Sequence, residues 1–269
     1  MDMQTKVIEI EEVAIRFSGD SGDGMQLTGT LFSDTSALFG NDVSTFPDYP
    51  AEIRAPQGTV GGVSGFQVHF GHSEINTPGD FCDVLVAMNP AALKANFRWI
   101  KPDGIIIADR DAFDEKNIIK AGYKEDPFKE EAVEGLQIIT APISSMTKEV
   151  LQDIGLDQKS ILRCKNMFAL GVVSWLFDRP LEHAITFFNQ KFAKKPILIE
   201  ANTKVLQAGY HYAENIQAFT NSFRVLPAEI PKGTYRNING NTAAAWGLLA
   251  ASERSGRKLK DLALGGYGF

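Results

Sequence analysis

Short apolar runs alternate with glycine-rich turns through the first half of the chain. The runs predict buried strands at residues 13–17, 43–46, 65–70, 81–88, 104–108 and 136–140. Between strands, the pair Asn89-Pro90 predicts a helix start, with the asparagine as N-cap or, alternatively, as a side chain presented at the end of a strand. Strands separated by helices favour a three-layer α/β/α domain with a mainly parallel sheet.

The second half of the chain has a helical pattern. Apolar spacing predicts helices at residues 146–154, 159–177, 181–192 and from 196 to about 221. The helix around residues 166–175 is apolar on nearly every side, so we expect it to be enclosed in the core. Pro227 and Pro231 then mark a linker.

A glycine-rich loop, Gly19-Asp20-Ser21-Gly22-Asp23-Gly24, joins the first strand to its helix, which is a favourable place for a phosphate-bearing ligand. It is not a Walker A loop, because Met25-Gln26 stands where Lys-Ser/Thr is required. Its glycine order reverses the dinucleotide fingerprint, and the asparagines of a thiamine–magnesium motif do not follow. Two interpretations stay open: N–H donors for a ligand, or a tight turn whose aspartates favour the helix N-terminus.

A second polar stretch follows the second strand and reads Phe46-Pro-Asp-Tyr-Pro-Ala-Glu-Ile-Arg-Ala-Pro56. Arg54 has the fork-shaped guanidinium that suits a phosphate, and Glu52 is placed to orient it. Tyr49 can stack or form a hydrogen bond. A loop brace or a subunit contact is an equally good account of the Glu52/Arg54 pair.

Composition narrows the classes of function. The 269 residues, 44 % of them hydrophobic, can bury a large core, and the net charge of −6 argues against nucleic acid or anionic membranes as partners. Cys82 and Cys164 lie in apolar runs, which predicts buried thiols, and two cysteines cannot hold a four-iron cluster. Without a signal peptide or a membrane-length apolar run, the sequence predicts a cytoplasmic protein.

The segments Arg16–Gln26 and Thr45–Pro56 closely resemble the gamma domain of 2-oxoacid:ferredoxin oxidoreductases. The form Tyr-Pro-Ala-Glu-Ile-Arg is most similar to the 2-oxoglutarate branch, in which this domain is fused to the start of the alpha subunit. The resemblance covers about residues 13–225 and a short piece after 236. It implies a polar lead-in at 1–12, a gamma domain on the coenzyme A side at 13–225 and a linker at 226–238. An incomplete second domain, the start of a thiamine-handling pyrimidine domain, follows at 239–269.

The resemblance also implies an activity that needs other chains. The family converts a 2-oxoacid and coenzyme A to acyl-CoA and carbon dioxide, and passes the electrons to ferredoxin. We expect this chain alone to hold no cofactor and to be inactive, with coenzyme A as a substrate of the complex. Thiamine diphosphate, magnesium and the iron–sulfur cluster are then expected in a thiamine-binding beta subunit, within a hetero-oligomer.

Together, the loop chemistry and the resemblance nominate residues for the coenzyme A site, with no catalytic or metal-ligating residue among them. They are Gly19, Asp20, Ser21, Gly22, Asp23, Gly24, Asp48, Tyr49, Glu52 and Arg54. Two other classes stay open: a non-catalytic assembly module, and a stand-alone nucleotide-binding oxidoreductase. The missing dinucleotide fingerprint weighs against the second.

If Arg54 pairs with a phosphate of coenzyme A, Arg54→Ala in the reconstituted enzyme weakens the use of coenzyme A and changes the use of the 2-oxoacid little. Steady-state kinetics with each substrate varied in turn measures both effects. An unchanged dependence on coenzyme A would contradict this role.

Overall fold

The computed structural model describes residues 6–49, 62–129, 133–216, 221–231 and 233–255. The chain divides into two units, Met1–Ile230 and Pro231–Phe269, and this boundary lies inside the linker predicted at 226–238. The second unit contains helix α9 (Gly240–Arg254). Its N-cap is Asn239, whose side-chain oxygen accepts a hydrogen bond from the Thr242 N–H at 2.8 Å.

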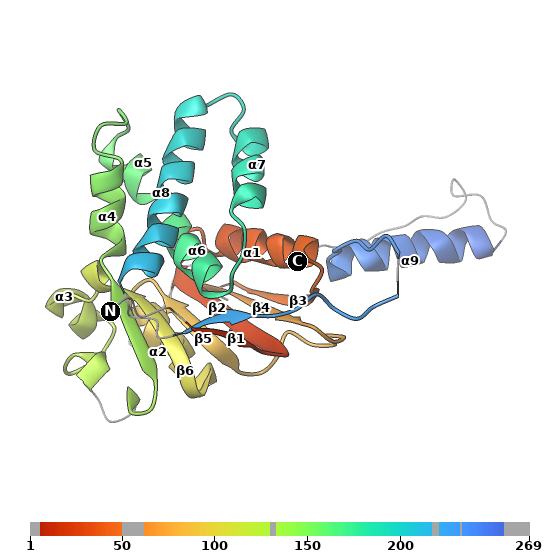
Figure 1. The fold of residues 1–269 in the computed structure, drawn as a ribbon, viewed down its shortest axis with the longest axis horizontal. Coiled ribbons are helices and arrows are strands. Elements are labelled where there is room, and N and C mark those ends of the chain that lie inside the picture. The colour runs from red at the N-terminus through yellow and green to blue at the C-terminus, as the bar shows by residue number, and fades with distance from the viewer. Residues whose placement is uncertain (1–5, 50–61, 130–132, 217–220, 232, 256–269) are drawn as a thin grey trace. The chain divides into compact units, whose positions relative to one another are not determined.

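A six-stranded sheet of order β3-β4-β2-β5-β6-β7 forms the centre of the first unit (Figure 1). Strands β2, β5, β6 and β7 are parallel, and β4 is antiparallel to both β2 and β3. The mainly parallel sheet predicted from sequence is therefore confirmed. The strands are β2 (Glu12–Asp20), β3 (Asp42–Asp48), β4 (Val63–Gly71), β5 (Cys82–Ala87), β6 (Ile100–Asp109) and β7 (Gln137–Ala141).

Helices cover both faces of this sheet. The first face carries α1 (Met25–Phe39), α4 (Ile143–Val150), α5 (Gln158–Leu162), α6 (Lys165–Leu176), α7 (Glu182–Lys191) and α8 (Pro196–Asn215). The second face carries α2 (Pro90–Asn96), on which α3 (Glu115–Lys120) packs, with short 3-10 turns at Phe97–Trp99, Arg110–Ala112 and Pro127–Lys129. This arrangement confirms the three-layer α/β/α class and the helical second half.

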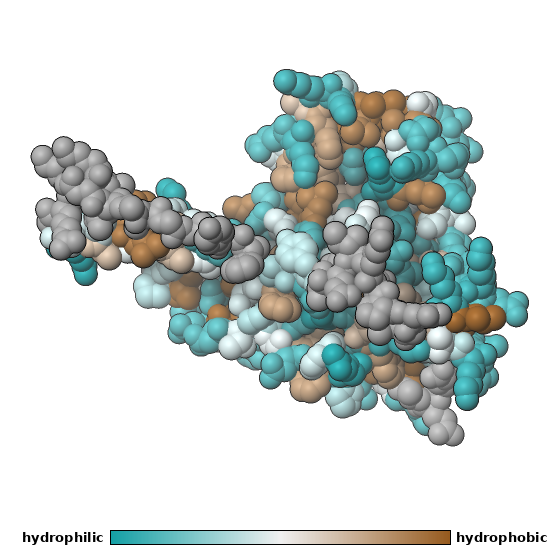
Figure 2. Space-filling model, turned by 180° about the vertical axis from the view of Figure 1, so that it is seen from behind, coloured by the Kyte–Doolittle hydropathy of each residue, from teal (hydrophilic) through white to brown (hydrophobic). Residues whose placement is uncertain are grey.

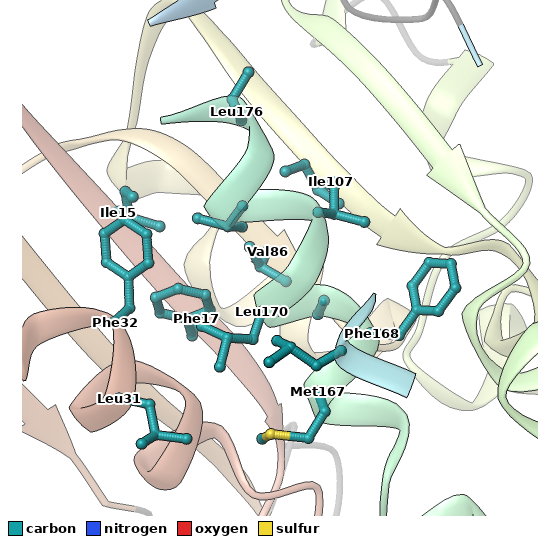
Figure 3. Packing of buried hydrophobic residues seen from close by; sticks show 14 of the residues in the cluster. Ile15, Phe17, Leu31, Phe32, Val86, Ile107, Met167, Phe168, Leu170 and Leu176 are labelled. Atoms are coloured by element: carbon teal, nitrogen blue, oxygen red, sulfur yellow. The ribbon is translucent and has the colours of Figure 1, made fainter. Parts of the chain in front are cut away.

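The alternation of side chains along β2 explains why the sheet needs both layers. Ile15 and Phe17 point to the first face, where Figure 3 shows them beside Phe32 of α1 and Leu170 of α6. Ala14 points to the opposite face and joins the α2 cluster. Because both faces of the strand are buried, its sequence is a nearly continuous apolar run rather than an alternating one.

The segment expected to be a polar lead-in contains a strand. Strand β1 (Lys6–Glu9) pairs in parallel with β8 (Asn221–Arg224), and they form a separate two-stranded sheet. The helix expected from residue 196 to about 221 is α8, and its helical residues end at Asn215. Each of the two paired strands has four residues, too few for an alternating pattern to be recognised in the sequence.

The single helix predicted at residues 159–177 is two helices in the structure. Residues 159–177 form α5, capped by Asp157, and α6, which starts at Lys165 after a break at Arg163 and Cys164. The first residues of α6 then reach the glycine-rich loop: Lys165 forms an ion pair with Asp23, and Asn166 donates to the Gly24 carbonyl at 3.3 Å. The helix that begins after the break thus contributes two contacts to the glycine-rich loop.

The surface of the described residues is mixed in polarity. Figure 2 shows mostly hydrophilic residues on the visible face, with hydrophobic ones in separate patches rather than one continuous area. Among the described residues, no helix is both long and apolar enough to cross a membrane.

Helices α6 and α8 approach each other so closely that glycine is required at their crossing. A Cβ on Gly171 would lie 2.1 Å from the Leu206 carbonyl oxygen, and a Cβ on Gly209 would lie 2.1 Å from that of Phe168. Backbone atoms cannot move aside as a flexible side chain does, so either substitution forces the two helices apart.

We therefore expect Gly171→Ala to lower the stability of the first unit by on the order of 1–3 kcal/mol, the usual cost of overpacking, despite the better helix propensity of alanine. Gly247→Ala is the matched control, because Gly247 is also helical but has open space around its Cβ position. Urea unfolding followed by circular dichroism measures the difference. Equal stability of the two variants would show that the crossing tolerates a methyl group.

Candidate functional site

The path of the chain creates a crevice between β2 and β5. These two strands are parallel neighbours, so their carboxyl ends lie at the same edge of the sheet. After β2 the chain enters α1 on the first face, whereas after β5 it enters α2 on the second. Where successive connections leave to opposite faces, the strand ends are left uncovered, and α/β proteins bind ligands at such points.

A pocket of about 640 Å³ occupies this position, within the size range of small-molecule sites. The glycine-rich loop, the end of β5, α3 and the start of α6 supply its walls. Its lining residues are Asp20, Ser21, Gly22, Gly62, Met88, Asn89, Pro90, Ala91, Ala112, Asn117, Lys120, Ala121 and Lys165. Three of the nominated residues, Asp20, Ser21 and Gly22, therefore line a single pocket.

The three glycines of the loop have different surroundings. Gly24, the N-cap of α1, has φ 76°, and a Cβ there would lie 2.5 Å from the Asn166 amide nitrogen. A Cβ on Gly19 would lie 2.9 Å from the Asp23 carboxylate. Gly24 is needed for the turn itself, whereas Gly19, at the end of β2, leaves room for the Asp23 side chain. Gly22 lines the pocket and has nothing within 4 Å of its Cβ position, so here the backbone is open to a ligand.

The backbone N–H groups of residues 20–23 in the loop donate to acceptors within the chain. The Asp20 N–H donates to the Asp23 carboxylate at 3.1 Å, and the Ser21 N–H donates to the Gly62 carbonyl at 2.8 Å. The N–H groups of Gly22 and Asp23 both donate to the Asp20 carbonyl, at 2.7 and 2.9 Å. In this conformation, the polar groups that face the pocket are therefore mainly side chains.

Side chains of Lys165 and Asn89, like that of Asn166, hold the loop against its neighbours. Lys165 Nζ lies 2.9 Å from Asp23 Oδ1, and both side chains are largely buried. Asn89 Nδ2 donates to Asp20 Oδ1 at 2.9 Å, while Asn89 Oδ1 accepts from the Ala92 N–H at 2.8 Å and caps α2. The N-cap prediction for Asn89 is confirmed, and the same side chain also lies at the carboxyl end of β5 in the pocket wall.

A buried arginine connects the two sequence motifs. Arg16 on β2 donates to Asn96 Oδ1 at 2.5 Å and to Gln67 Oε1 at 3.1 Å, and it forms an ion pair with Asp48 at the end of β3. Gln26, at the end of the first motif, donates to the Asp48 carbonyl at 3.4 Å. Two residues of the first motif, Arg16 and Gln26, thus hold Asp48 of the second motif in place.

The remaining nominated residues divide into two groups. Asp48 is used in the contact with Arg16, and Tyr49 is 66 % exposed. Glu52 and Arg54 lie outside the described residues. Lys120 and Lys165, which line the pocket, were not nominated, because nothing near them in the sequence distinguishes them from surface lysines.

The two thiols do not fit a metal cluster. Cys82 belongs to the core on the α2 face of the sheet and Cys164 to the core on the opposite face. Burial raises the pKa of Cys82 to about 12 and that of Cys164 to about 11, so both are neutral thiols at physiological pH. The prediction of buried thiols is confirmed. Across the described ranges, no group of three or more His, Cys, Asp or Glu side chains is placed to bind a metal ion.

Comparisons with known proteins agree with the resemblance seen in the two motifs. The family model for pyruvate ferredoxin/flavodoxin oxidoreductase matches residues 14–212. The 2-oxoglutarate oxidoreductase subunit KorA of Mycobacterium tuberculosis is 47 % identical over 247 residues, which are 92 % of this chain and 38 % of that protein. The chain therefore spans well under half the length of this curated relative.

Solved structures share the fold. A 2-oxoglutarate:ferredoxin oxidoreductase from Magnetococcus marinus, solved with 2-oxoglutarate, coenzyme A and succinyl-CoA bound, matches 93 % of this chain and 43 % of its own, with a TM-score of 0.65 and 23 % identity. The gamma subunit of a keto/oxoacid ferredoxin oxidoreductase from Geobacter sulfurreducens matches 75 % of this chain and 98 % of its own, with a TM-score of 0.52 and 21 % identity. A pyruvate oxidoreductase subunit from Thermotoga maritima matches 75 % of this chain and 97 % of its own, with a TM-score of 0.51 and 20 % identity.

The network around Arg16 leads to a stability prediction. Arg16→Met leaves Asn96 and Gln67 without their buried donor, so we expect a loss of about 2–3 kcal/mol. The matched control is Arg224→Met, which breaks an Arg–Asp pair whose side chains are both more than 40 % exposed and which should cost about 0–1 kcal/mol. Chemical denaturation compares the two, and equal losses would mean that the network contributes no more than a surface ion pair.

Proposed function

The chain belongs to the pyruvate ferredoxin/flavodoxin oxidoreductase family, and we propose that it is a subunit of a 2-oxoglutarate:ferredoxin oxidoreductase. In this reaction, a 2-oxoacid and coenzyme A yield acyl-CoA and carbon dioxide while ferredoxin is reduced. Identity of 47 % to a 2-oxoglutarate oxidoreductase subunit supports 2-oxoglutarate as the substrate.

Within that enzyme, the first unit helps to form the coenzyme A site. The pocket at the ends of β2 and β5 carries this proposal, because it combines a ligand-sized volume, an open backbone at Gly22 and a position where α/β folds bind ligands. The coenzyme A bound in the Magnetococcus marinus enzyme supports the choice of ligand. Tyr49, Glu52 and Arg54 remain proposed contacts on sequence grounds.

The redox chemistry is assigned to other chains of the complex. Thiamine diphosphate with magnesium supplies the carbanion chemistry, and an iron–sulfur cluster carries electrons to ferredoxin. We place these groups in a thiamine-binding beta subunit, because two buried thiols on opposite faces of one sheet do not fit a cluster. The part of this chain is then to bind coenzyme A and hold it toward the partner.

An assembly role is the second candidate, and exposed apolar side chains on α9 favour it. Trp246, Leu248 and Leu249 are 48 %, 54 % and 39 % exposed, and large apolar residues of this kind are typical of protein interfaces. In this case the chain stabilises a subunit contact without binding coenzyme A.

Anaerobic co-purification of the native complex, followed by viologen reduction with 2-oxoglutarate, separates these candidates. We expect dye reduction that requires coenzyme A, and a second subunit that carries thiamine diphosphate and iron–sulfur. A complex that assembles but in which this chain makes no contribution to coenzyme A binding would favour the assembly role. A colourless, inactive chain without a partner would contradict the enzyme proposal.

A further inference from the structure

The pocket at the ends of β2 and β5 is lined by two ammonium groups. Lys120 enters from the last turn of α3, and within the described chain it forms no ion pair. Lys165 enters from the first turn of α6. Against a protein net charge of −6, a pocket with two cations is a local exception.

The carboxylates around these lysines are engaged by other groups. Asp20 is the one carboxylate among the described lining residues, and the amide of Asn89 donates to it at 2.9 Å. Asp23 does not line the pocket but pairs with Lys165 at 2.9 Å. An anion that enters the pocket therefore meets Lys120 directly and competes with Asp23 for Lys165.

Apolar side chains form part of the remaining wall, beside the polar Ser21, Asn89 and Asn117. Met88, Pro90 and Ala91 come from the β5–α2 connection, while Ala112 and Ala121 come from the chain between β6 and β7. Apolar walls beside two ammonium groups suit a ligand that combines phosphate with a ring system, because the ring packs on the wall and the phosphate accepts charge-assisted hydrogen bonds. A small anion alone would leave most of the 640 Å³ unfilled.

We propose that this pocket binds the phosphorylated nucleotide end of coenzyme A, and that Lys120 and Lys165 hold its phosphates. The inference rests on the proposed function and deepens it, because it assigns the nucleotide end, rather than the thiol end, to this chain. Lys165 exchanges Asp23 for a phosphate when the ligand binds. Occupancy of the pocket thereby removes one of the side-chain contacts that hold the glycine-rich loop, while those of Asn89 and Asn166 remain.

The test compares variants of the reconstituted holoenzyme. Lys120→Gln and Lys165→Gln are each expected to raise KM for coenzyme A roughly tenfold, the effect of losing one charge-assisted contact. They should not change KM for 2-oxoglutarate. Lys116→Gln is the matched control for Lys120, since it removes a lysine of the same helix that does not line the pocket.

The Asp23→Asn variant distinguishes a phosphate-binding role of Lys165 from a purely structural one. Both Asp23→Asn and Lys165→Gln break the same ion pair, but only the second removes the cation. A purely structural role predicts that both raise KM for coenzyme A. The proposed role predicts opposite effects, with a lower KM in Asp23→Asn because Lys165 is released for the phosphate.

Calorimetry with adenosine 3′,5′-bisphosphate measures binding at the pocket without any enzyme turnover. This probe lacks the thiol end of coenzyme A. We expect it to bind the complex and to bind the Lys120→Gln variant about tenfold more weakly. Unchanged KM and binding in both lysine variants of an active enzyme would overturn the inference and leave the proposed function intact. Lysine-dependent binding in a complex without 2-oxoglutarate activity would support the site and contradict the function.

Discussion

The divergence of α1 and α2 from neighbouring parallel strands is the constraint on which the candidate site depends. Strands β2 and β5 end side by side, and the apolar residues of the following helices commit α1 to one face of the sheet and α2 to the other. The space between them follows from the topology and not from any single loop residue. Side chains from the loop, α3 and α6 then give this space its charge and shape.

Two aspartates in a loop proposed to lie near a phosphate are at first sight unfavourable, because like charges repel. In the structure, however, both aspartates have partners. Asp23 is paired with Lys165, and Asp20 accepts a hydrogen bond from Asn89, so both carboxylates stabilise the loop. The backbone N–H groups of residues 20–23 also have acceptors within the chain. The loop therefore acts as a braced wall with one open backbone position, Gly22, while cations from distant segments supply the attraction for an anion.

The contrast between local features, such as the loop, and side chains from distant segments explains how much of the protein could be predicted from sequence. Runs such as 81–88 predict their strands because burial on both faces leaves only apolar residues, and the pair Asn89-Pro90 carries its own cap signal. The pairing of β1 with β8 could not be predicted, because it joins two short segments more than 200 residues apart. Lys165 is the first residue of α6, after a break at Arg163 and Cys164, and neither residue at the break is a typical turn residue that would have predicted it.

The first of the two motifs that carry the family resemblance contacts the described start of the second. Arg16 and Gln26 stand at the two ends of the first motif, and both contact Asp48 in the second. The choice between a brace and a ligand contact was posed for the Glu52/Arg54 pair, which lies outside the described residues, so it stays a prediction. Asp48, at the start of that stretch, is held by Arg16, whereas the neighbouring Tyr49 is exposed at the end of β3. Because β3 runs parallel to β2, that end lies at the same edge of the sheet as the pocket, and the contact with Arg16 fixes Asp48 there.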